Sequence, residues 1–530
     1  MSKRIPFSIL TVALVAMVLV TMAAPGSTGP SGQTIWASRP LVIGSCCDEP
    51  KTIDPAVTID IPGTRIVSMA YEPLISYRKG TAEFEPVLAT SWEVSPDGKV
   101  YTFQLRRGVK FHDGTSFNER AVKVTFDRVK AVKLGVSFFL DNMAEVKVVG
   151  PMKVQIVLTR PDVAFLYGLP RIKIISPSAL AKNRRGDDWG QDFFRSNEAG
   201  TGPYRLDRWD RARQIEMVAF KDYWRGWSGK HIQRIIDRFS VDLSTKLLLL
   251  ERGEMDIIEP IGLSDIKRLQ NNPRVRIGAV DVLRGYYHTV NNQRGPLRDK
   301  RVRQAMLLAF PYDEMRQLMS GYATPLRSVV PSTLDGFCTA FEPRQDLVRA
   351  KQLLAEAGFP TGGFRLTLVY LPGIEPERLS AQLFKAALAE LGVTLDLQEK
   401  EWGTLLESQK RVDTAPDFAA LYVTSPVPYA GAQLFRLGHS SIRGQSYNWQ
   451  FYDNKEFDKL IETAQETLDR TRRNEMLCRA QRMLMDDAAI MPIMNQQWLD
   501  ASRSRVTGYK YDPYAYVFDL HAYGLFIEGE

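Results

Sequence analysis

The sequence lacks the short motifs by which catalytic and metal sites are commonly recognised. It has only five histidines and four cysteines in 530 residues. No histidine stands in an H-E-x-x-H or another compact ligand spacing, and no C-x-x-C pair is present. A G-x-S-x-G elbow and a G-x-x-x-x-G-K-[ST] loop are absent as well. We therefore expect no enzyme, no catalytic residues, no metal and no cofactor.

The sequence has little excess charge of either sign. It contains 69 Lys and Arg against 61 Asp and Glu, a formal net charge of +8. The basic runs at 182–185 and 298–303 have acidic residues within or near them, which is typical of a solvated surface. We expect no nucleic-acid partner. The length favours two or three lobes of a globular protein.

The N-terminus has the order of a secretory signal peptide. Lys3 and Arg4 precede an apolar run over about 7–24, and a stretch rich in Gly, Ser, Pro and Thr follows at 25–32. We predict that residues 1–37 are signal peptide and linker, cleaved between about 24 and 37, and that the protein is periplasmic. The apolar run is long for a signal peptide, so an uncleaved membrane anchor is the alternative.

In an oxidising compartment the four cysteines are able to pair. Cys46 and Cys47 are adjacent, and a bridge between them would strain the peptide that joins them. A bridge between Cys338 and Cys478 would join distant parts of the chain. The sequence leaves the connectivity of all four cysteines open.

Two stretches predict ordered α/β structure. The turn chemistry of 95–98 and the alternation of 100–105 predict a hairpin, and a capping box at 116–119 predicts the start of a helix. Alternation at 364–370, helical spacing at 378–391 and renewed alternation at 393–397 predict a strand–helix–strand unit. The lone G-x-G at 200–202 precedes Pro203, which lacks the N–H that a phosphate loop needs.

Four segments resemble a known family. They are LVIG and TIDP within 41–55, EPLISY through LATSWEVSPDGKVYTFQLRRGVKFHDG within 72–114, GTGPY at 200–204, and YYHTVNNQRGPLRDKRVRQAMLLAF at 286–310. Together they resemble the extracellular solute-binding proteins of the peptide/nickel type (family 5), which include the periplasmic dipeptide- and oligopeptide-binding proteins of ABC importers.

The resemblance implies an α/β periplasmic-binding-protein fold. Two lobes would be joined by hinge strands, with an extra α/β domain inserted in the first lobe, and the ligand would bind in the cleft between the lobes. The expected boundaries are 38–80, 201–285 and 499–530 for lobe one, 81–200 for the inserted domain and 286–498 for lobe two.

The same resemblance implies a transport function. The protein would be a monomer that captures a peptide-like or other small polar solute and delivers it to the permease subunits in the inner membrane. Two alternatives remain open: an exported hydrolase acting on peptides or glycosides, and a membrane-anchored receptor or chaperone.

The residues expected at the ligand follow from the family resemblance. The candidate positions lie in both lobes. They are an aromatic residue at the end of a lobe-two strand, the loop after it, an arginine at a helix start, an asparagine in the segment of resemblance at 286–310, and the loop after the first strand. They are Trp402, Tyr422, Ser425, Tyr429, Arg378, Asn291 and Asp60.

The lobe-two loop also bears on the kind of ligand. Dipeptide-binding members hold the ligand α-ammonium with an aspartate there, whereas this chain has no acidic residue between Asp417 and Asp453. A buried ammonium without a counter-charge is costly. We therefore expect free dipeptides to bind poorly, and a saccharide, a blocked peptide or an opine-like compound to bind better, unless an acid from elsewhere, such as Asp60, supplies the charge.

Overall fold

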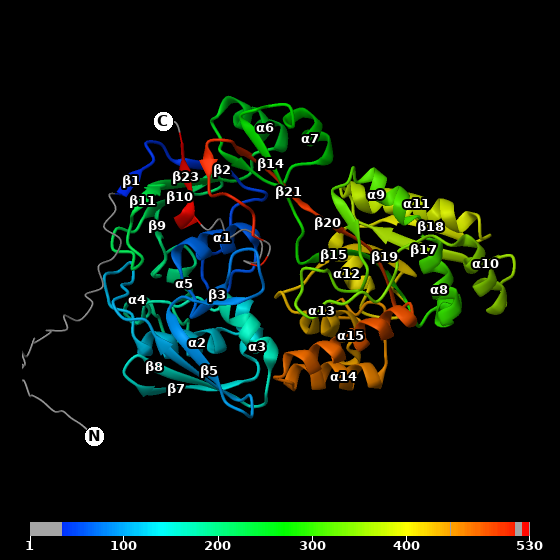
Figure 1. The fold of residues 1–530 in the computed structure, drawn as a ribbon, viewed down its shortest axis with the longest axis horizontal. Helices are drawn as coiled ribbons and strands as arrows, with labels where there is room; N and C mark the ends of the chain where they lie inside the picture. Colours follow the sequence, from blue (N-terminus) through cyan, green and yellow to red (C-terminus); the bar gives the residue numbers. More distant parts are fainter. Residues whose placement is uncertain (1–33, 446, 513, 515–521, 529–530) are drawn as a thin grey trace, which may run out of the picture.

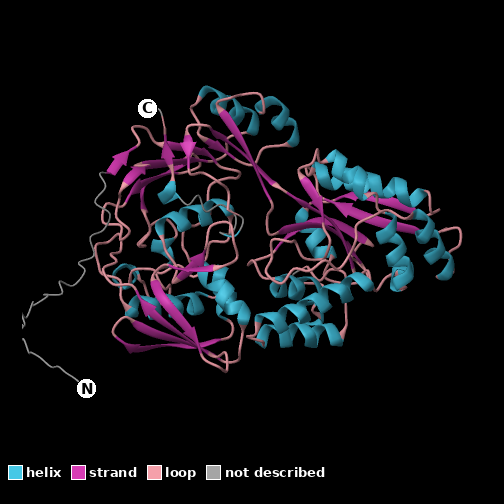
Figure 2. Cartoon of the chain, in the orientation of Figure 1, coloured by secondary structure: helices cyan, strands magenta, loops and turns pink. Residues whose placement is uncertain are grey.

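The computed structural model describes residues 34–445, 447–512, 514 and 522–528. The predicted signal peptide, and the linker up to residue 33, lie outside the described residues. Within the described part, no helix has the length and apolarity to cross a membrane. The described chain forms two lobes and an inserted domain, each built on its own β-sheet with helices packed against it (Figures 1 and 2).

Lobe one is built on a seven-stranded mixed sheet in which β2 lies between two parallel neighbours, β12 and β13. The core beneath it also takes in Ala179, Leu180 and Phe194 from α4 and α5. In spatial order the strands are β14 (Val275–Val280), β21 (Trp498–Arg503), β13 (Ile257–Ile258), β2 (Leu41–Gly44), β12 (Arg234–Arg238), β10 (Gln214–Ala219) and β9 (Tyr204–Asp210). The helices are α1 (Ile61–Ala70), α4 (Pro177–Asn183), α5 (Gln191–Phe194), α6 (Leu243–Arg252) and α7 (Leu263–Leu269).

The inserted domain is a four-stranded antiparallel sheet covered by α2 (Glu119–Val132). Its strands are β5 (Ala89–Val94), β6 (Val100–Leu105), β8 (Lys153–Leu158) and β7 (Met143–Gly150), and the helical segments η1 (Gly135–Leu140) and α3 (Val163–Gly168) flank it. The hairpin predicted at 95–98 is confirmed. The predicted capping box is wrong in detail: Asn118, not Ser116, caps α2, because its side chain accepts from the Arg120 N–H (3.1 Å).

Lobe two is built on a six-stranded sheet and carries the largest apolar core of the molecule. The predicted strand–helix–strand unit is confirmed, since β17 and β18 are parallel and α11 connects them. In spatial order the strands are β16 (Ala323–Pro325), β20 (Ile490–Gln496), β15 (Arg284–Val290), β19 (Phe418–Thr424), β17 (Arg365–Tyr370) and β18 (Thr394–Glu399). The helices are α8 (Lys300–Ala309), α9 (Tyr312–Leu318), α10 (Leu347–Glu356), α11 (Glu375–Ala389), α12 (Trp402–Ser408), α13 (Ala430–Gly438), α14 (Lys455–Glu466) and α15 (Arg470–Asp486).

Two strand pairs connect the lobes. β14 and β21 are antiparallel neighbours in lobe one, and their continuations β15 and β20 are antiparallel neighbours in lobe two. Where the two strand pairs pass between the lobes, the Gln497 side-chain amide donates to the Asp281 carboxylate (3.1 Å). These strands cross from one lobe to the other near the top of Figure 1 and form the hinge.

The GTGPY segment is a place of close backbone approach. A Cβ on Gly200 would lie 1.9 Å from the Ala70 carbonyl oxygen, and one on Gly202 would lie 2.4 Å from that of Met69. Because only glycine leaves this space, the two glycines let the chain pass against the end of α1 on its return into lobe one. This packing explains the G-x-G pattern without a phosphate.

The structure contains both of the disulfides that the sequence left undecided. Cys46 bonds Cys47 in the loop after β2, and Cys338 bonds Cys478 across 140 residues of lobe two. The second bridge ties α15 to the segment that precedes α10. Among the described residues no cysteine is left free.

Candidate functional site

Three cavities lie at the junction of the lobes, and each is lined from both sides. The cleft cavity has a volume of about 640 Å³ and lies between the inserted domain and α13 of lobe two. A smaller cavity of about 40 Å³ shares Arg171, Pro426 and Val427 with it. The lateral cavity has a volume of about 680 Å³. Its lining includes Val163, Leu166 and Tyr167 of α3. The space available to a solute therefore follows the junction between the lobes.

The inserted domain gives the cleft cavity an aromatic wall. Phe138 and Phe139 of η1 have ring centroids 4.0 Å apart, and Phe138 is 50% exposed. Gly168 at the end of α3 permits this packing, because a Cβ there would lie 2.6 Å from the Phe139 ring. Phe435 of α13 contributes a ring from lobe two. These rings offer contact to an apolar part of a solute.

Charged side chains of both signs line the same cavity. The cations are Arg160, Arg171 and Arg436, and the anions are Asp141 and Asp162. Burial raises the pKa of Asp162, and a hydrogen bond from the Asn142 amide (2.7 Å) opposes the rise. Burial also raises the pKa of Asp141. The lining has groups that pair with either sign of charge on a solute.

The loop after β19 is held in place by backbone hydrogen bonds. The Ser425 N–H donates to the Leu283 carbonyl beside the hinge (2.8 Å), and its Oγ donates to the Val427 carbonyl (2.6 Å). At the far end, the backbone of Asp335 exchanges two hydrogen bonds with the loop at 428 and 430 (3.0 and 2.8 Å). The loop therefore presents Pro426 and Val427 to the cleft cavity from a fixed backbone.

Helix α3 of the inserted domain contacts lobe two through Tyr167. The Tyr167 ring stacks on Tyr429, with centroids 4.9 Å apart and planes at 15°, and its hydroxyl donates to the Asp335 carboxylate. Asp335 also pairs with Arg470 (2.6 Å). Burial first and Asp335 second raise the pKa of Tyr167, so the hydroxyl stays a donor. Tyr167 belongs to the same apolar cluster as the core of lobe two.

Three of the predicted residues lie on or beside this loop. Ser425 and Tyr429 belong to it and are buried. Tyr422 lies on β19, where its ring packs 4.8 Å from Tyr286 and under the Arg284 guanidinium (4.5 Å). Ser425 thus lies at the hinge side of lobe two, Tyr422 lies on the strand before it, and Tyr429 lies at the α3 end of the same loop.

Trp402 lies at the end of a series of neighbouring rings that are tilted against one another. It begins α12, is 42% exposed, and its ring is 5.7 Å from that of Trp449. Trp449 in turn lies 5.3 Å from Tyr447, over which the Arg436 guanidinium lies at 4.6 Å. Since Arg436 lines the cleft cavity, this series connects Trp402 to the rim of that cavity.

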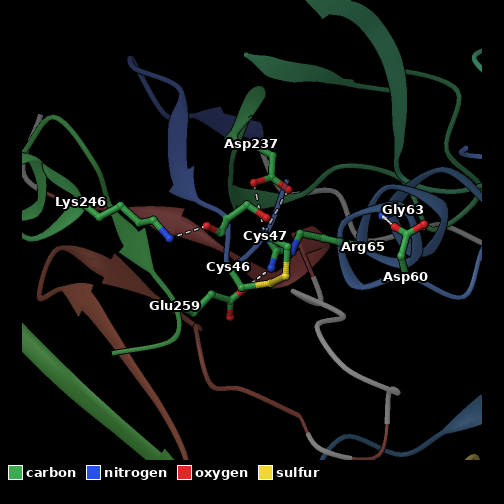
Figure 3. Close-up of a disulfide and its surroundings, with 9 residues drawn as sticks. Cys46, Cys47, Asp60, Gly63, Arg65, Asp237, Lys246 and Glu259 are labelled. Carbon is green, nitrogen blue, oxygen red and sulfur yellow. Dashed lines mark hydrogen bonds and ion pairs between the residues drawn. A yellow bond between two sulfur atoms is a disulfide. The ribbon is translucent and has the colours of Figure 1, made fainter. Parts of the chain in front are cut away.

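Neither these four residues nor the other three predicted residues line any of the three cavities. Arg378 is exposed and pairs with Glu375. Asn291 is buried past the end of β15 that lies away from the hinge, and its amide donates to the Val412 carbonyl (3.0 Å). Asp60 caps α1 by accepting from the Gly63 N–H (2.7 Å) (Figure 3).

The inserted domain supplies cleft residues that the sequence reasoning missed. Phe138, Phe139, Arg171 and Tyr167 all come from segments between 135 and 171 that carry no recognisable motif. One signal for them was available in the sequence. Phe138 and Phe139 are adjacent, lie shortly after Gly135 and stand outside any strongly periodic run, and exposed aromatic pairs often mark contact surfaces.

A buried ionic cluster in lobe one joins α1 to the central strands, beside the Cys46–Cys47 bridge (Figure 3). Arg65 of α1 pairs with Asp237 of β12 (3.0 Å) and with Glu259, which follows β13. Burial raises the pKa of Asp237, and Arg65 opposes the rise. Beside it, Lys246 donates to the Ser45 carbonyl (2.6 Å), just before the Cys46–Cys47 bridge. The cluster fixes α1 to the carboxyl ends of the central strands.

The described residues contain no group of three His, Cys, Asp or Glu side chains that could hold a metal ion. The cleft cavity is lined from two sides by aromatic and charged side chains.

The comparisons with known proteins agree with this geometry. The profile of the bacterial extracellular solute-binding proteins, family 5 Middle, matches residues 83–442. The probable D,D-dipeptide-binding periplasmic protein DdpA of Escherichia coli (strain K12) is 29% identical, over 89% of this chain and 92% of DdpA. The glutathione-binding protein GsiB of Pectobacterium atrosepticum is 28% identical, over 90% of this chain and 92% of GsiB. The structure of MoaA from A. tumefaciens R10 in complex with mannopinic acid has a TM-score of 0.73 and 25% identity, and the match covers 93% of this chain and 100% of MoaA. The chain belongs to the bacterial extracellular solute-binding proteins of family 5.

Proposed function

We propose that this protein is the substrate-binding subunit of an ABC importer that captures a small polar or peptide-like solute in the periplasm. The observation that carries the proposal is the cleft cavity. The inserted domain lines it on one side and lobe two on the other, in a chain that belongs to a solute-binding family. The names of the relatives, a D,D-dipeptide-binding and a glutathione-binding periplasmic protein, support both the compartment and the ligand class.

The geometry also supports capture by closure. The hinge strands keep the lobes connected, while α3 and the loop at 424–430 meet across the cleft. A solute that contacts both walls binds the closed form better than the open form and shifts the population toward it. The closed protein is then the form that a membrane permease would recognise, and the protein itself performs no reaction.

Three arginines against two acids whose pKa is raised by burial favour a ligand with an anionic or neutral polar group, and the rings favour an apolar part. No carboxylate faces the cavity from the loop at 424–430, where Ser425 donates its hydroxyl hydrogen to the loop backbone. Asp60, the acid named above as an alternative source of that charge, caps α1. Asp141 and Asp162 line the opposite wall, so they are the groups through which a free ammonium would have to bind. The structural neighbour MoaA is in complex with mannopinic acid, which by its name carries an acid group.

Mass spectrometry of the solute that copurifies with periplasmic protein identifies the ligand directly. Calorimetric titration then compares dipeptides with their N-acetylated forms. We expect the acetylated forms to bind at least as tightly, because removal of the ammonium avoids its desolvation. Micromolar binding of free dipeptides that disappears on acetylation would overturn the assignment of ligand charge, and the absence of any solute that raises the melting temperature would overturn the transport function.

A further inference from the structure

The lateral cavity is a second space between the halves of the molecule. Helix α3 separates it from the cleft cavity: Val163, Leu166 and Tyr167 line the lateral cavity, while Ala164 and Phe165 line the cleft cavity. Its volume of about 680 Å³ is within the usual range for sites that bind small molecules. The function proposed above makes no use of it.

Aromatic side chains form the wall that the inserted domain contributes. Trp92 of β5 pairs with Phe103 and Tyr101 of β6 pairs with Val94, so Trp92 and Tyr101 are diagonal cross-strand neighbours, and both line the cavity. Phe84 lies edge-on to Tyr167, with centroids 5.1 Å apart, and closes the wall. Rings arranged in this way offer flat, apolar contact to another ring.

A buried guanidinium lies on the opposite wall. Arg473 of α15 is only 5% exposed, and its Nη1 donates to the Thr467 and Leu468 carbonyls (3.1 and 2.9 Å). Its Nε has no hydrogen-bond partner, and no carboxylate of the described residues forms an ion pair with it. The neighbouring cation, Arg470, is different, because it is exposed and pairs with Asp335 (2.6 Å).

The difference between Arg473, which has no ion pair, and Arg470, which has one, points to an anionic ligand. A buried charge without a counter-charge is unfavourable, and an anionic group in the cavity would remove that penalty while it accepts from the guanidinium. Because Nη1 already donates to two carbonyls and Nε is buried, Nη2 is the nitrogen left to donate to a carboxylate, in a charge-assisted hydrogen bond. The aromatic wall across the cavity suits the apolar body of the same molecule.

We propose that the lateral cavity binds a small aromatic carboxylate, with the carboxylate on Arg473 and the ring against Trp92 and Tyr101. The two walls belong to different halves of the molecule, since Trp92 and Tyr101 come from the inserted domain and Arg473 from lobe two. A molecule in this cavity therefore binds the closed form better than the open form and couples to closure from outside the cleft.

Calorimetry on the full-length mature protein, with phenylacetate and its neutral analogue phenylacetamide as probes, tests the proposal. We expect saturable binding of phenylacetate and affinity lower by about tenfold or more for phenylacetamide, because a hydrogen bond to a charged group is lost. Arg473→Gln should reduce phenylacetate affinity by a similar factor. Arg472→Gln, at an exposed position of the same helix, should leave it unchanged.

Two further variants keep the test decisive. Trp92→Ala removes ring contact at a half-buried strand position and should weaken phenylacetate binding by about tenfold even if Arg473→Gln does not fold. Phe138→Ala removes a ring of the cleft cavity and should leave phenylacetate binding unchanged. Equal affinity for the two probes, no saturable binding, or loss of binding only in Phe138→Ala would overturn the proposal. None of these outcomes bears on the proposed transport function, which is tested by the solute that copurifies.

Discussion

The two ends of the cleft are joined in different ways. At the hinge end, the backbone itself passes between the lobes, and β14 with β21 and β15 with β20 form antiparallel ladders on the two sides. At the α3 end, the contact is made by side chains: Tyr167 stacks on Tyr429 and bonds Asp335, and Arg160 lies 3.8 Å from Glu466.

This difference separates two kinds of residue. Ladder hydrogen bonds and buried ion pairs at the hinge end persist in every folded conformation, so they determine stability. A few side-chain contacts at the α3 end are able to break without unfolding either half, so they determine how often the cleft is closed. Substitutions at the two ends should therefore change different measurements.

The largest effect is expected from the buried ionic cluster near the hinge. Arg65→Met leaves Asp237 and Glu259 buried without their cation, and removal of one partner from such a cluster costs about 3–5 kcal/mol of unfolding free energy. Chemical denaturation measures this loss. Arg411→Gln breaks an exposed pair with Asp413 and should change stability by less than about 0.5 kcal/mol.

A loss below about 1 kcal/mol in Arg65→Met would mean that the cluster does not anchor α1. Neutralising the acids in the same chain, with Asp237→Asn and Glu259→Gln added to Arg65→Met, should restore part of the stability. Burial of two unpaired charges is then avoided.

The next effect is a pH dependence that belongs to the hinge strand β21. Burial raises the pKa of Asp500 to about 7, although the neighbouring Tyr509 hydroxyl opposes the rise. The folded state thus keeps a proton that the unfolded state releases near pH 4. Stability is fully present below about pH 4, falls by about 1.4 kcal/mol per pH unit as the pH rises to about 7, and is level above it.

Asp500→Asn should remove this slope, as measured by urea denaturation across that pH range. Glu377 in lobe two, whose pKa burial also raises to about 7, should still contribute its own slope in the same direction. An unchanged pH profile in Asp500→Asn would show that Asp500 is ionised in the folded protein at neutral pH.

The α3 end should change ligand affinity instead. Tyr167→Phe keeps the ring on Tyr429 but loses the hydrogen bond to the Asp335 carboxylate, a bond worth about 1.5 kcal/mol or more. Because this bond exists only when the halves meet, we expect about tenfold weaker binding of the copurifying solute, mostly through faster dissociation.

Stopped-flow and calorimetric titration measure this change, and small-angle scattering of the liganded variant should show a larger radius of gyration. Tyr312→Phe is the matched control, since its hydroxyl bonds Leu307 within lobe two (3.2 Å). Equal losses of affinity in both variants would show that the Tyr167 bond has no special role in closure.

The comparison also shows which parts of this molecule the sequence could predict. The hairpin at 95–98 and the parallel pair β17–β18 depend on turn chemistry and periodicity, which are local, and both are confirmed. The contact between Tyr167 and Asp335 joins residues 168 positions apart, and nothing local requires it. The resemblance to a family pointed to the loop at 424–430, of which Pro426 and Val427 line the cleft cavity. It gave no information on Phe138 or on Arg473, whose positions depend on which surfaces face each other across the junction.

The smallest effect is expected from Trp402, and it tests how far the site extends beyond the cavity. Trp402 is 42% exposed, and it reaches the cleft cavity only through Trp449, Tyr447 and Arg436. A half-exposed ring at a rim contributes less than a buried anchor, so Trp402→Ala should weaken solute binding by about threefold and leave stability within about 0.5 kcal/mol. Leu406→Ala, on the same helix and also exposed, is the control and should change neither. A loss of a hundredfold in calorimetry would instead show that the Trp402 ring contacts the solute directly. That result would move the centre of the site from the α3 end toward α12, and closure would then depend on the aromatic series rather than on Tyr167.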